Sequence, residues 1–247
     1  MKNNLHSRIF TLTGIFIKEQ FKEPIALFWI MLSPCALFYF FAATKQDANY
    51  FQSEYIEASA WFYAYVSSSV ALFGFAFYII GRRESGFIRS FIYSKQSKII
   101  FLYSHFFAYS LISIAYCSIF YLATKIPFGS YDLEELLRIT LRFYTCFVMF
   151  CSLGAAFTLL PINFQNSNTL LSICSFFMLI LGVLGASKTN DIVDIINLAN
   201  PLTTATNLMT NDLNHNKPTV AIIALFAIAS ALALLKHLRI NPVWSRY

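Results

Sequence analysis

The chain of 247 residues is 57% hydrophobic and 18% aromatic, and only 12% of its residues are charged. Because an ordinary soluble domain has about 25% charged residues, this composition and the mean hydropathy of +0.59 exclude a soluble globular protein. The net charge of +6 would suit a nucleic-acid partner, but the basic residues are distributed as membrane-topology signals instead.

The first segment, residues 7–23, alternates apolar and polar side chains at helical spacing. Leu12 and Phe16 fall on one side of such a helix, and Lys18 falls on the other. We expect this helix to lie in the inner membrane interface with its apolar face toward lipid. Pro24 is expected to end the helix and turn the chain into the bilayer.

Six apolar runs follow, each close to the roughly 20 residues that cross about 30 Å of hydrocarbon. They are residues 25–44, 60–81, 99–124, 137–160, 168–186 and 219–235. The predicted fold is therefore an all-α integral membrane protein. It has an N-terminal interfacial amphipathic helix plus six transmembrane helices, in a single transmembrane domain over residues 1–247.

The loops between these runs differ in charge. Twelve Lys and Arg residues lie before Pro24, in residues 82–98 and from Lys236 onward, whereas four lie in the alternate loops. Nine of the twelve acidic residues lie in those alternate loops. The positive-inside rule therefore predicts a multi-pass protein of the plasma (inner) membrane, with both termini in the cytoplasm.

The spans hold few groups that could carry chemistry. No Asp, Glu or Lys lies inside the six runs, so a secondary transporter of another class would lack the buried charges it needs. The five cysteines are expected to be apolar packing residues, and His105 to be a hydrogen-bonded structural residue rather than a proton carrier. No phosphate-binding loop occurs in the chain. We expect no catalytic residue, metal or cofactor here, so energy for uphill transport would come from another subunit.

Residues 82–98, RRESGFIRSFIYSKQSK, form the one strongly basic stretch. Apolar and aromatic residues interleave with its charges: Phe87, Ile88, Phe91, Ile92 and Tyr93. A loop made only for solvation would not expose such residues, which favours a docking helix at the cytoplasmic surface. The alternative is a solvated loop that only fixes topology.

The outer loop, residues 187–217, is long for a structureless connection. The apolar stripe from Ile192 to Leu198 predicts that part of it re-enters the outer interface; an ordinary surface loop is the alternative.

Glu134, Arg138 and Arg142 share one face of a helix at the outer end of the fourth run. Ion pairing and snorkelling to headgroups account for them, and contact with an anionic lipid or substrate is the alternative.

Three loose motifs occur in order along the chain. The first is Lys22-Glu23-Pro24, followed by Phe28-Trp29 and Pro34. The second, after the second run, is Arg82-Arg83-Glu84-Ser85-Gly86-Phe87-Ile88, and the third, in the last outer loop, is Leu198-Ala199-Asn200-Pro201-Leu202-Thr203-Thr204-Ala205. With six spans, this order and spacing resemble the ABC-2 type transporter permeases of the drug and antibiotic export kind.

The resemblance implies a type V exporter-like fold in a bacterial inner membrane. It implies two copies of an ABC ATPase, which carry ATP and Mg, and a second copy of the permease or a related permease, all among membrane lipids. The ATPase-coupling residues that it implies are Arg82, Arg83, Glu84, Gly86, Phe87, Arg89 and Phe91. The substrate pathway would be lined by Phe62, Tyr65, Ser69, Phe73, Ser172, Ser175, Phe176 and Met178. The outer gate would contain Ile195, Asn200 and Pro201.

Such a pathway is apolar and aromatic with scattered hydroxyls, which suits a hydrophobic or amphiphilic substrate such as a drug, antibiotic, peptide or lipid-like molecule. The chain itself is not expected to be an enzyme. Two alternatives stay open: a permease that exports polysaccharide or lipid-linked glycan, and a membrane assembly protein that transports nothing and binds no ATPase.

Overall fold

The computed structural model describes residues 3–44, 54–186, 197, 199–211, 213 and 216–243. This described part contains helices and no strand. The elements, in chain order, are α1 (Asn3–Phe21), α2 (Pro24–Thr44), α3 (Tyr55–Ser69), the π-helical η2 (Val70–Ala76), α4 (Phe77–Glu84), α5 (Phe87–Phe91), α6 (Lys95–Thr124), the 3-10 turn η3 (Ile126–Phe128), α7 (Leu133–Leu159), α8 (Phe164–Ala186), α10 (Pro201–Thr210) and α11 (Lys217–His237).

A long helix lies at each of the six predicted spans. Five of these helices are long and apolar enough to cross a membrane: Tyr55–Glu84, Lys95–Thr124, Leu133–Leu159, Phe164–Gly182 and Lys217–His237. The sixth is α2, whose apolar portion with described side chains runs over Ile30–Thr44. By length and composition, the described helices therefore have the character of membrane spans, as the sequence predicts.

The second span differs from the prediction in length. Instead of residues 60–81, one continuous helix runs over Tyr55–Glu84 through α3, η2 and α4. Arg82, Arg83 and Glu84 therefore belong to this helix rather than to a loop. At 1.5 Å per residue, 30 residues span about 45 Å, which exceeds the hydrocarbon core and carries the charged end beyond it.

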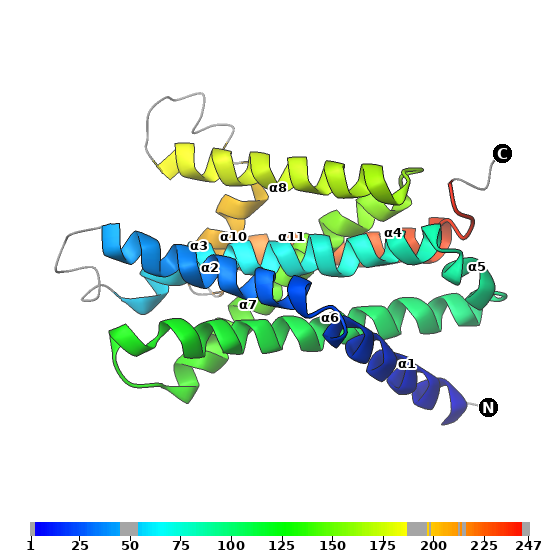
Figure 1. Ribbon diagram of the computed structural model, residues 1–247, viewed down its shortest axis with the longest axis horizontal. Coiled ribbons are helices and arrows are strands. Elements are labelled where there is room, and N and C mark those ends of the chain that lie inside the picture. Colours follow the sequence, from blue (N-terminus) through cyan, green and yellow to red (C-terminus); the bar gives the residue numbers. More distant parts are fainter. Residues whose placement is uncertain are drawn as a thin grey trace.

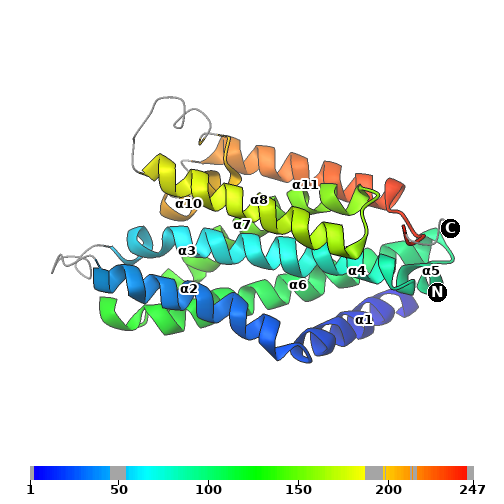
Figure 2. The same ribbon diagram turned by 45° about the horizontal axis from the view of Figure 1, so that its top comes forward.

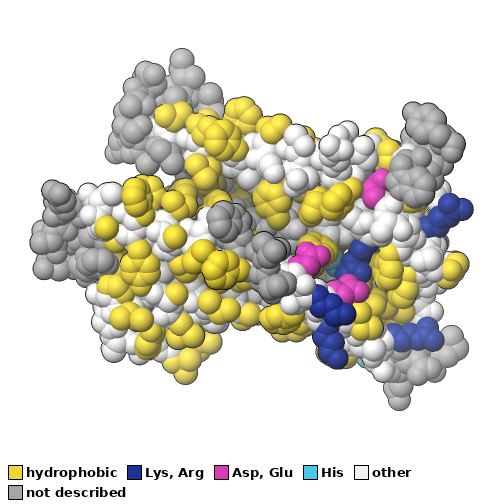
Figure 3. Space-filling view, in the orientation of Figure 1, with side chains coloured by type: hydrophobic (Ala, Val, Ile, Leu, Met, Phe, Trp, Pro, Cys, Tyr) yellow, Lys and Arg dark blue, Asp and Glu magenta, His cyan; other side chains and the backbone are white. Residues whose placement is uncertain are grey.

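The long helices lie side by side in an elongated bundle, and the described chain begins and ends at the same end of it (Figures 1 and 2). Helix α5 lies at that end, which we call the α5 end. Of the side chains drawn on the face in Figure 3, the charged ones also gather toward the α5 end. The charge pattern of the loops predicts that the α5 end faces the cytoplasm.

The helix from Tyr55 to Glu84 is the centre of the bundle. In its most apolar stretch of 18 residues, about 67% is buried inside the bundle, against 11% in the corresponding stretches of α8 and of α11. Aromatic rings fill the core around it: Phe38, Phe62, Tyr63, Phe120, Phe143 and Phe147. Several of these rings meet edge to face, as Tyr63 and Phe120 do at 4.8 Å between centroids. Helices α8 and α11 thus leave most of their surface to lipid or to other subunits.

The helix ends follow from local sequence. Ser94 begins α6, since its Oγ accepts from the backbone N–H of Ser97 at 3.2 Å. Asp132 begins α7 in the same way, with Oδ1 3.0 Å from the N–H of Glu134. Gly86, at φ +78°, supplies the left-handed residue that separates α4 from α5.

Helix α1 begins earlier and ends earlier than the predicted interfacial helix of residues 7–23. Its apolar side is divided: Leu12 and Phe16 are buried in the core, and α1 packs mainly on α6, whereas Phe10 and Phe21 are exposed. The expectation that the whole apolar face meets lipid is therefore wrong for Leu12 and Phe16. Pro24 is the first residue of α2 rather than the end of α1, which fits the preference of proline for a first helical turn.

Candidate functional site

The predicted coupling residues cluster at the α5 end, but two of them are interior residues. The side chains of Arg83 and Glu84 are only 1% and 7% exposed, and Arg83 Nε lies 2.9 Å from Glu84 Oε1. The Arg83 guanidinium also donates to the carbonyls of Thr158 and Leu160, each at 3.0 Å, and to that of Ile162. It therefore holds the end of α7 and the turn into α8.

Glu84 also binds the C-terminal segment. Its two carboxylate oxygens accept from the backbone N–H of Val243 at 3.1 and 3.2 Å. The Arg83–Glu84 pair thus ties three segments together: α4, the α7–α8 turn and the chain after α11. An exposed charge that docks a partner was expected at Glu84, and its burial does not fit that expectation.

Arg82 connects α4 to the interfacial helix. Its guanidinium pairs with the Glu19 carboxylate and lies over the Phe16 ring, with Cζ 4.1 Å from the centroid. One turn earlier on α4, the Tyr78 hydroxyl donates to Glu23. Helices α1 and α4 are therefore held together by an ion pair and a cation–π contact, and Tyr78 ties α4 to the connection between α1 and α2.

Helix α5 presents a mixed face. Ile88 and Ile92 are buried, and the parallel rings of Phe87 and Phe91, 5.7 Å apart, are half-buried. These residues attach α5 to the bundle, so the apolar residues of this stretch are not exposed as a group. Arg89 is exposed, and Tyr93, which the sequence places in the docking stretch but not among the coupling residues, is 83% exposed.

The predicted pathway residues of the second span lie in a row that the bundle covers only partly. Tyr65, Ser69 and Phe73 are half-exposed, and so are Trp61 and Phe77, which were not predicted. The row begins with the Trp61 and Tyr65 rings, stacked 5.8 Å apart. We call these five residues the α3 row.

Phe62 does not belong to this row. Its side chain is 5% exposed and packs against Phe38, with ring centroids 5.3 Å apart. The burial of Phe62 does not fit a place on the open side, which the preceding residue, Trp61, occupies.

Helix α8 lies alongside the α3 row at both of its ends. The rings of Phe164 and Phe77 lie 4.5 Å apart near the α5 end. At the other end, a Cβ on Gly182 would lie 3.6 Å from Trp61 Nε1. The predicted pathway residues of α8 thus flank the row: Ser172 and Phe176 are exposed, and Ser175 and Met178 are half-exposed.

One face of α8 carries a stripe of polar side chains, of which sequence reasoning identified only Ser172. Gln165, Asn168, Thr169 and Ser172 are all exposed and recur at helical spacing toward Phe176. Polar amides facing lipid are unfavourable, so this stripe indicates contact with water or with another subunit. The signal for it was the set of Asn and Gln side chains in residues 165–168, most of which lie before the predicted span of residues 168–186.

Phe73 of the α3 row belongs to the π-helical segment η2. π-Helical turns are rare and are frequent at functional sites. His105 is fully buried beneath η2, and its Nε2 lies 3.0 Å from the carbonyl oxygen of Phe75. A carbonyl can only accept, so Nε2 carries the proton; this confirms the expected structural hydrogen bond of His105.

The predicted gate residues Asn200 and Pro201 lie at the start of α10. Asn200 is buried; its Oδ1 accepts from the N–H of Leu202 at 3.0 Å, and its Nδ2 donates to the Met178 carbonyl at 2.9 Å. A predicted gate residue is thus bonded to a predicted pathway residue. Ile195 and most of the Ile192–Leu198 stripe lie outside the described residues.

The two arginines of the fourth span have different roles. Arg142 donates to the carbonyls of Met209 and Thr210 at 2.9 and 3.3 Å, at the end of α10. Arg138 pairs with Glu134 at 3.5 Å, and both side chains are exposed. The expected pairing is confirmed for Arg138, whereas Arg142 holds the end of α10.

No family model matches the chain, and no solved structure matches it. Protein McbE of Escherichia coli is 29% identical to it over 235 residues, which cover 94% of this chain and 96% of McbE. The similarity therefore runs over nearly the whole of both proteins. The chain is an all-helical, membrane-type protein similar to McbE along its length.

Proposed function

We propose that this chain is the membrane-spanning permease subunit of an ATP-driven exporter of the ABC-2 type. In this proposal an ATPase subunit in two copies binds at the α5 end and supplies the energy. A second copy of this chain, or a related permease, completes the pathway. The cargo is hydrophobic or amphiphilic, because the α3 row is aromatic with only two hydroxyls, those of Tyr65 and Ser69.

The polar stripe of α8 carries this proposal. The stripe lies exposed on a helix of which only 11% of the most apolar stretch is buried; its residues are Gln165, Asn168, Thr169 and Ser172. On a lipid-facing helix these amides would lose hydrogen bonds to water without replacement. A seam between two permease copies that admits water and cargo would satisfy them.

Helix α5 supports an ATPase contact. It is anchored to the bundle by Ile88 and Ile92, and it presents Arg89 and Tyr93 outward. Gly86 fixes its direction relative to α4. A partner that moves α5 would therefore move α4 and the segments held by Arg83 and Glu84.

The test is association with an ATPase in mild detergent. Arg89→Glu should reduce co-purification of the ATPase without lowering the melting temperature of this chain, because Arg89 is exposed and a reversed charge opposes docking. Arg138→Glu is the matched control, since Arg138 is exposed outside the α5 end.

A second test addresses the seam. In a cysteine-free background, Ser172→Cys should form an oxidative cross-link with another permease copy in membranes, whereas Ile228→Cys on α11 should not. If no protein with a phosphate-binding loop co-purifies and Ser172→Cys does not cross-link, the exporter proposal fails. The chain would then be a membrane protein without a transport role.

A further inference from the structure

Two cavities meet between α6 and α11, and Leu235 lines both of them. The cavity nearer the α5 end measures about 730 Å³ and is lined by Lys95, Lys98 and Lys236. The cavity farther into the span measures about 210 Å³. Together they form one groove with a basic end and an apolar end, which we call the α6–α11 groove.

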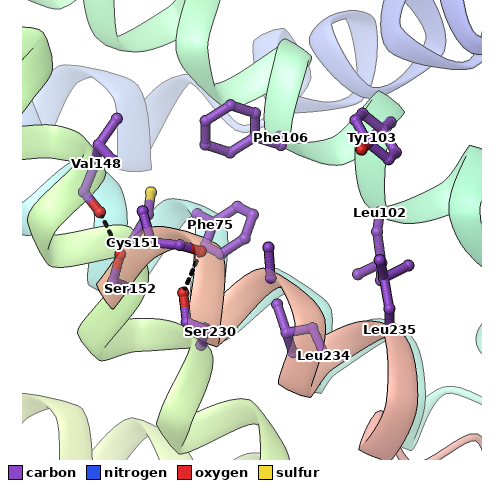
Figure 4. A pocket seen from close by; sticks show the side chains of 13 residues that line it. Phe75, Leu102, Tyr103, Phe106, Val148, Cys151, Ser152, Ser230, Leu234 and Leu235 are labelled. Atoms are coloured by element: carbon purple, nitrogen blue, oxygen red, sulfur yellow. Dashed lines mark hydrogen bonds between the residues drawn. The ribbon is translucent and has the colours of Figure 1, made fainter. Parts of the chain in front are cut away.

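The apolar end offers almost no polar group to a ligand (Figure 4). Phe75, Leu102, Phe106 and Leu234 line it. Its two serine hydroxyls are turned to their own helices, since Ser152 donates to the Val148 carbonyl at 2.8 Å and Ser230 donates to the Ala227 carbonyl at 3.0 Å. Such a cavity accepts hydrocarbon.

Among the described residues, no acidic side chain pairs with the lysines of the basic end, Lys95, Lys98 and Lys236. Lys98 Nζ approaches only the Leu238 carbonyl, at 3.5 Å. Lys95 and Lys98 lie one turn apart on α6 and face Lys236 across the same cavity. An anion in this cavity would therefore be attracted by three ammonium groups.

The dimensions match one lipid chain. From Lys95 to Phe106, α6 rises about 16 Å at 1.5 Å per residue. Half of the hydrocarbon core is about 15 Å. The rim of the groove includes Ile99, Tyr103 and Leu232, which are exposed on helices long enough to span the membrane. The groove therefore opens toward lipid at the depth where a headgroup and its first acyl chain lie.

We propose that the α6–α11 groove binds one anionic phospholipid. Its phosphate pairs with Lys95, Lys98 and Lys236, and one acyl chain fills the cavity against Phe75 and Phe106. By the positive-inside prediction, this lipid belongs to the cytoplasmic leaflet. The proposal does not depend on the exporter function, because it concerns this chain alone.

The test measures lipid binding to the purified full-length chain in neutral detergent. Phosphatidylglycerol and phosphatidylcholine with the same acyl chains are titrated, and the bound lipid is counted by native mass spectrometry. We expect tighter binding of phosphatidylglycerol, and a loss of about fivefold in affinity for each lysine changed to glutamine. The triple variant Lys95→Gln, Lys98→Gln, Lys236→Gln should lose on the order of a hundredfold.

Two matched controls separate the groove from general effects. Lys217→Gln, at the opposite end of α11, should leave the affinity unchanged. Ala227→Phe, which fills the apolar cavity, should weaken the binding of both lipids. Ala229→Phe should leave it unchanged, because Ala229 is exposed on the same helix but does not line the cavity. Melting temperatures in phosphatidylcholine identify any variant that fails to fold.

Equal affinity for the two lipids, or a triple variant that keeps the preference for phosphatidylglycerol, overturns the proposal. Glycerol phosphate, which has the phosphate but no acyl chain, tests whether the groove binds a free phosphate compound instead of a lipid. If it competes at the same concentration as the lipid, the groove is an anion site and the proposal of a lipid site is wrong. If only the intact lipid binds tightly, the headgroup and the chain act together as proposed.

Discussion

Glu84→Gln tests the interior ion pair at the α5 end. The substitution keeps the size and one carbonyl oxygen of the side chain, but it removes the charge opposite Arg83. Breaking a buried pair by removing one partner costs about 3–5 kcal/mol, because the other charge stays in the interior. The carbonyls of Thr158, Leu160 and Ile162 still accept from Arg83, so we expect the lower part of this range, about 3 kcal/mol.

The assay is thermal unfolding of the purified chain in mild detergent. For a chain of this length, 1 kcal/mol corresponds to about 2–4 °C, so the Glu84→Gln variant should melt about 6–12 °C below the wild type. Glu134→Gln is the matched control, because its pair with Arg138 is exposed and such pairs contribute about 0–1 kcal/mol. A Glu84→Gln variant that melts together with Glu134→Gln would refute the burial argument.

The same burial changes how variants of Glu84 should be interpreted. Glu84→Lys places a second cation beside Arg83 in the interior, so we expect it to disturb the fold itself. A loss of ATPase association in that variant would not show that Glu84 touches the ATPase. Arg89, exposed on α5, is the position that separates contact from stability.

Two further predictions concern close packing and the start of α10. Gly154→Ala should destabilise the protein by about 1–3 kcal/mol, because the new Cβ would lie 2.9 Å from the Cβ of Ala76; Gly14→Ala in α1, with no atom within 4 Å of its Cβ, should be neutral or stabilising. Asn200→Ala removes the helix cap and the bond to the Met178 carbonyl and should cost about 1–3 kcal/mol in the same assay. Unchanged melting of either variant would contradict the corresponding contact.

The helices could be predicted because a membrane span is a property of a continuous stretch of sequence. Each apolar run became a long helix, and several helix starts have a local signal, such as Ser94, Asp132 or Pro201. The burial of Arg83 could not be predicted in this way. Its carbonyl acceptors lie 75 or more residues away, and only the packed bundle brings them to the guanidinium.

The partly exposed side of the central helix contains the predicted pathway residues of this helix except one. Tyr65, Ser69 and Phe73 lie half-buried on that side, whereas Phe62, next to Trp61 in α3, is buried. In η2 the hydrogen bonds span five residues, and Ser69, Phe73 and Phe77, which flank or belong to it, stay on the partly exposed side. A sequence pattern that assumes a uniform α-helix does not contain this turn.

The π-helical segment η2 connects the two open surfaces of the protein. Phe73 belongs to the α3 row, and Phe75, two residues later, lines the apolar end of the α6–α11 groove. Between them Gly74 lies against the ring of Tyr109, and His105 holds the Phe75 carbonyl. A lipid chain in the groove would therefore press on the same helical turn that faces the proposed pathway. Because π-helical turns are less regular than α-helical ones, we expect a change on either surface to displace this turn before the rest of the central helix.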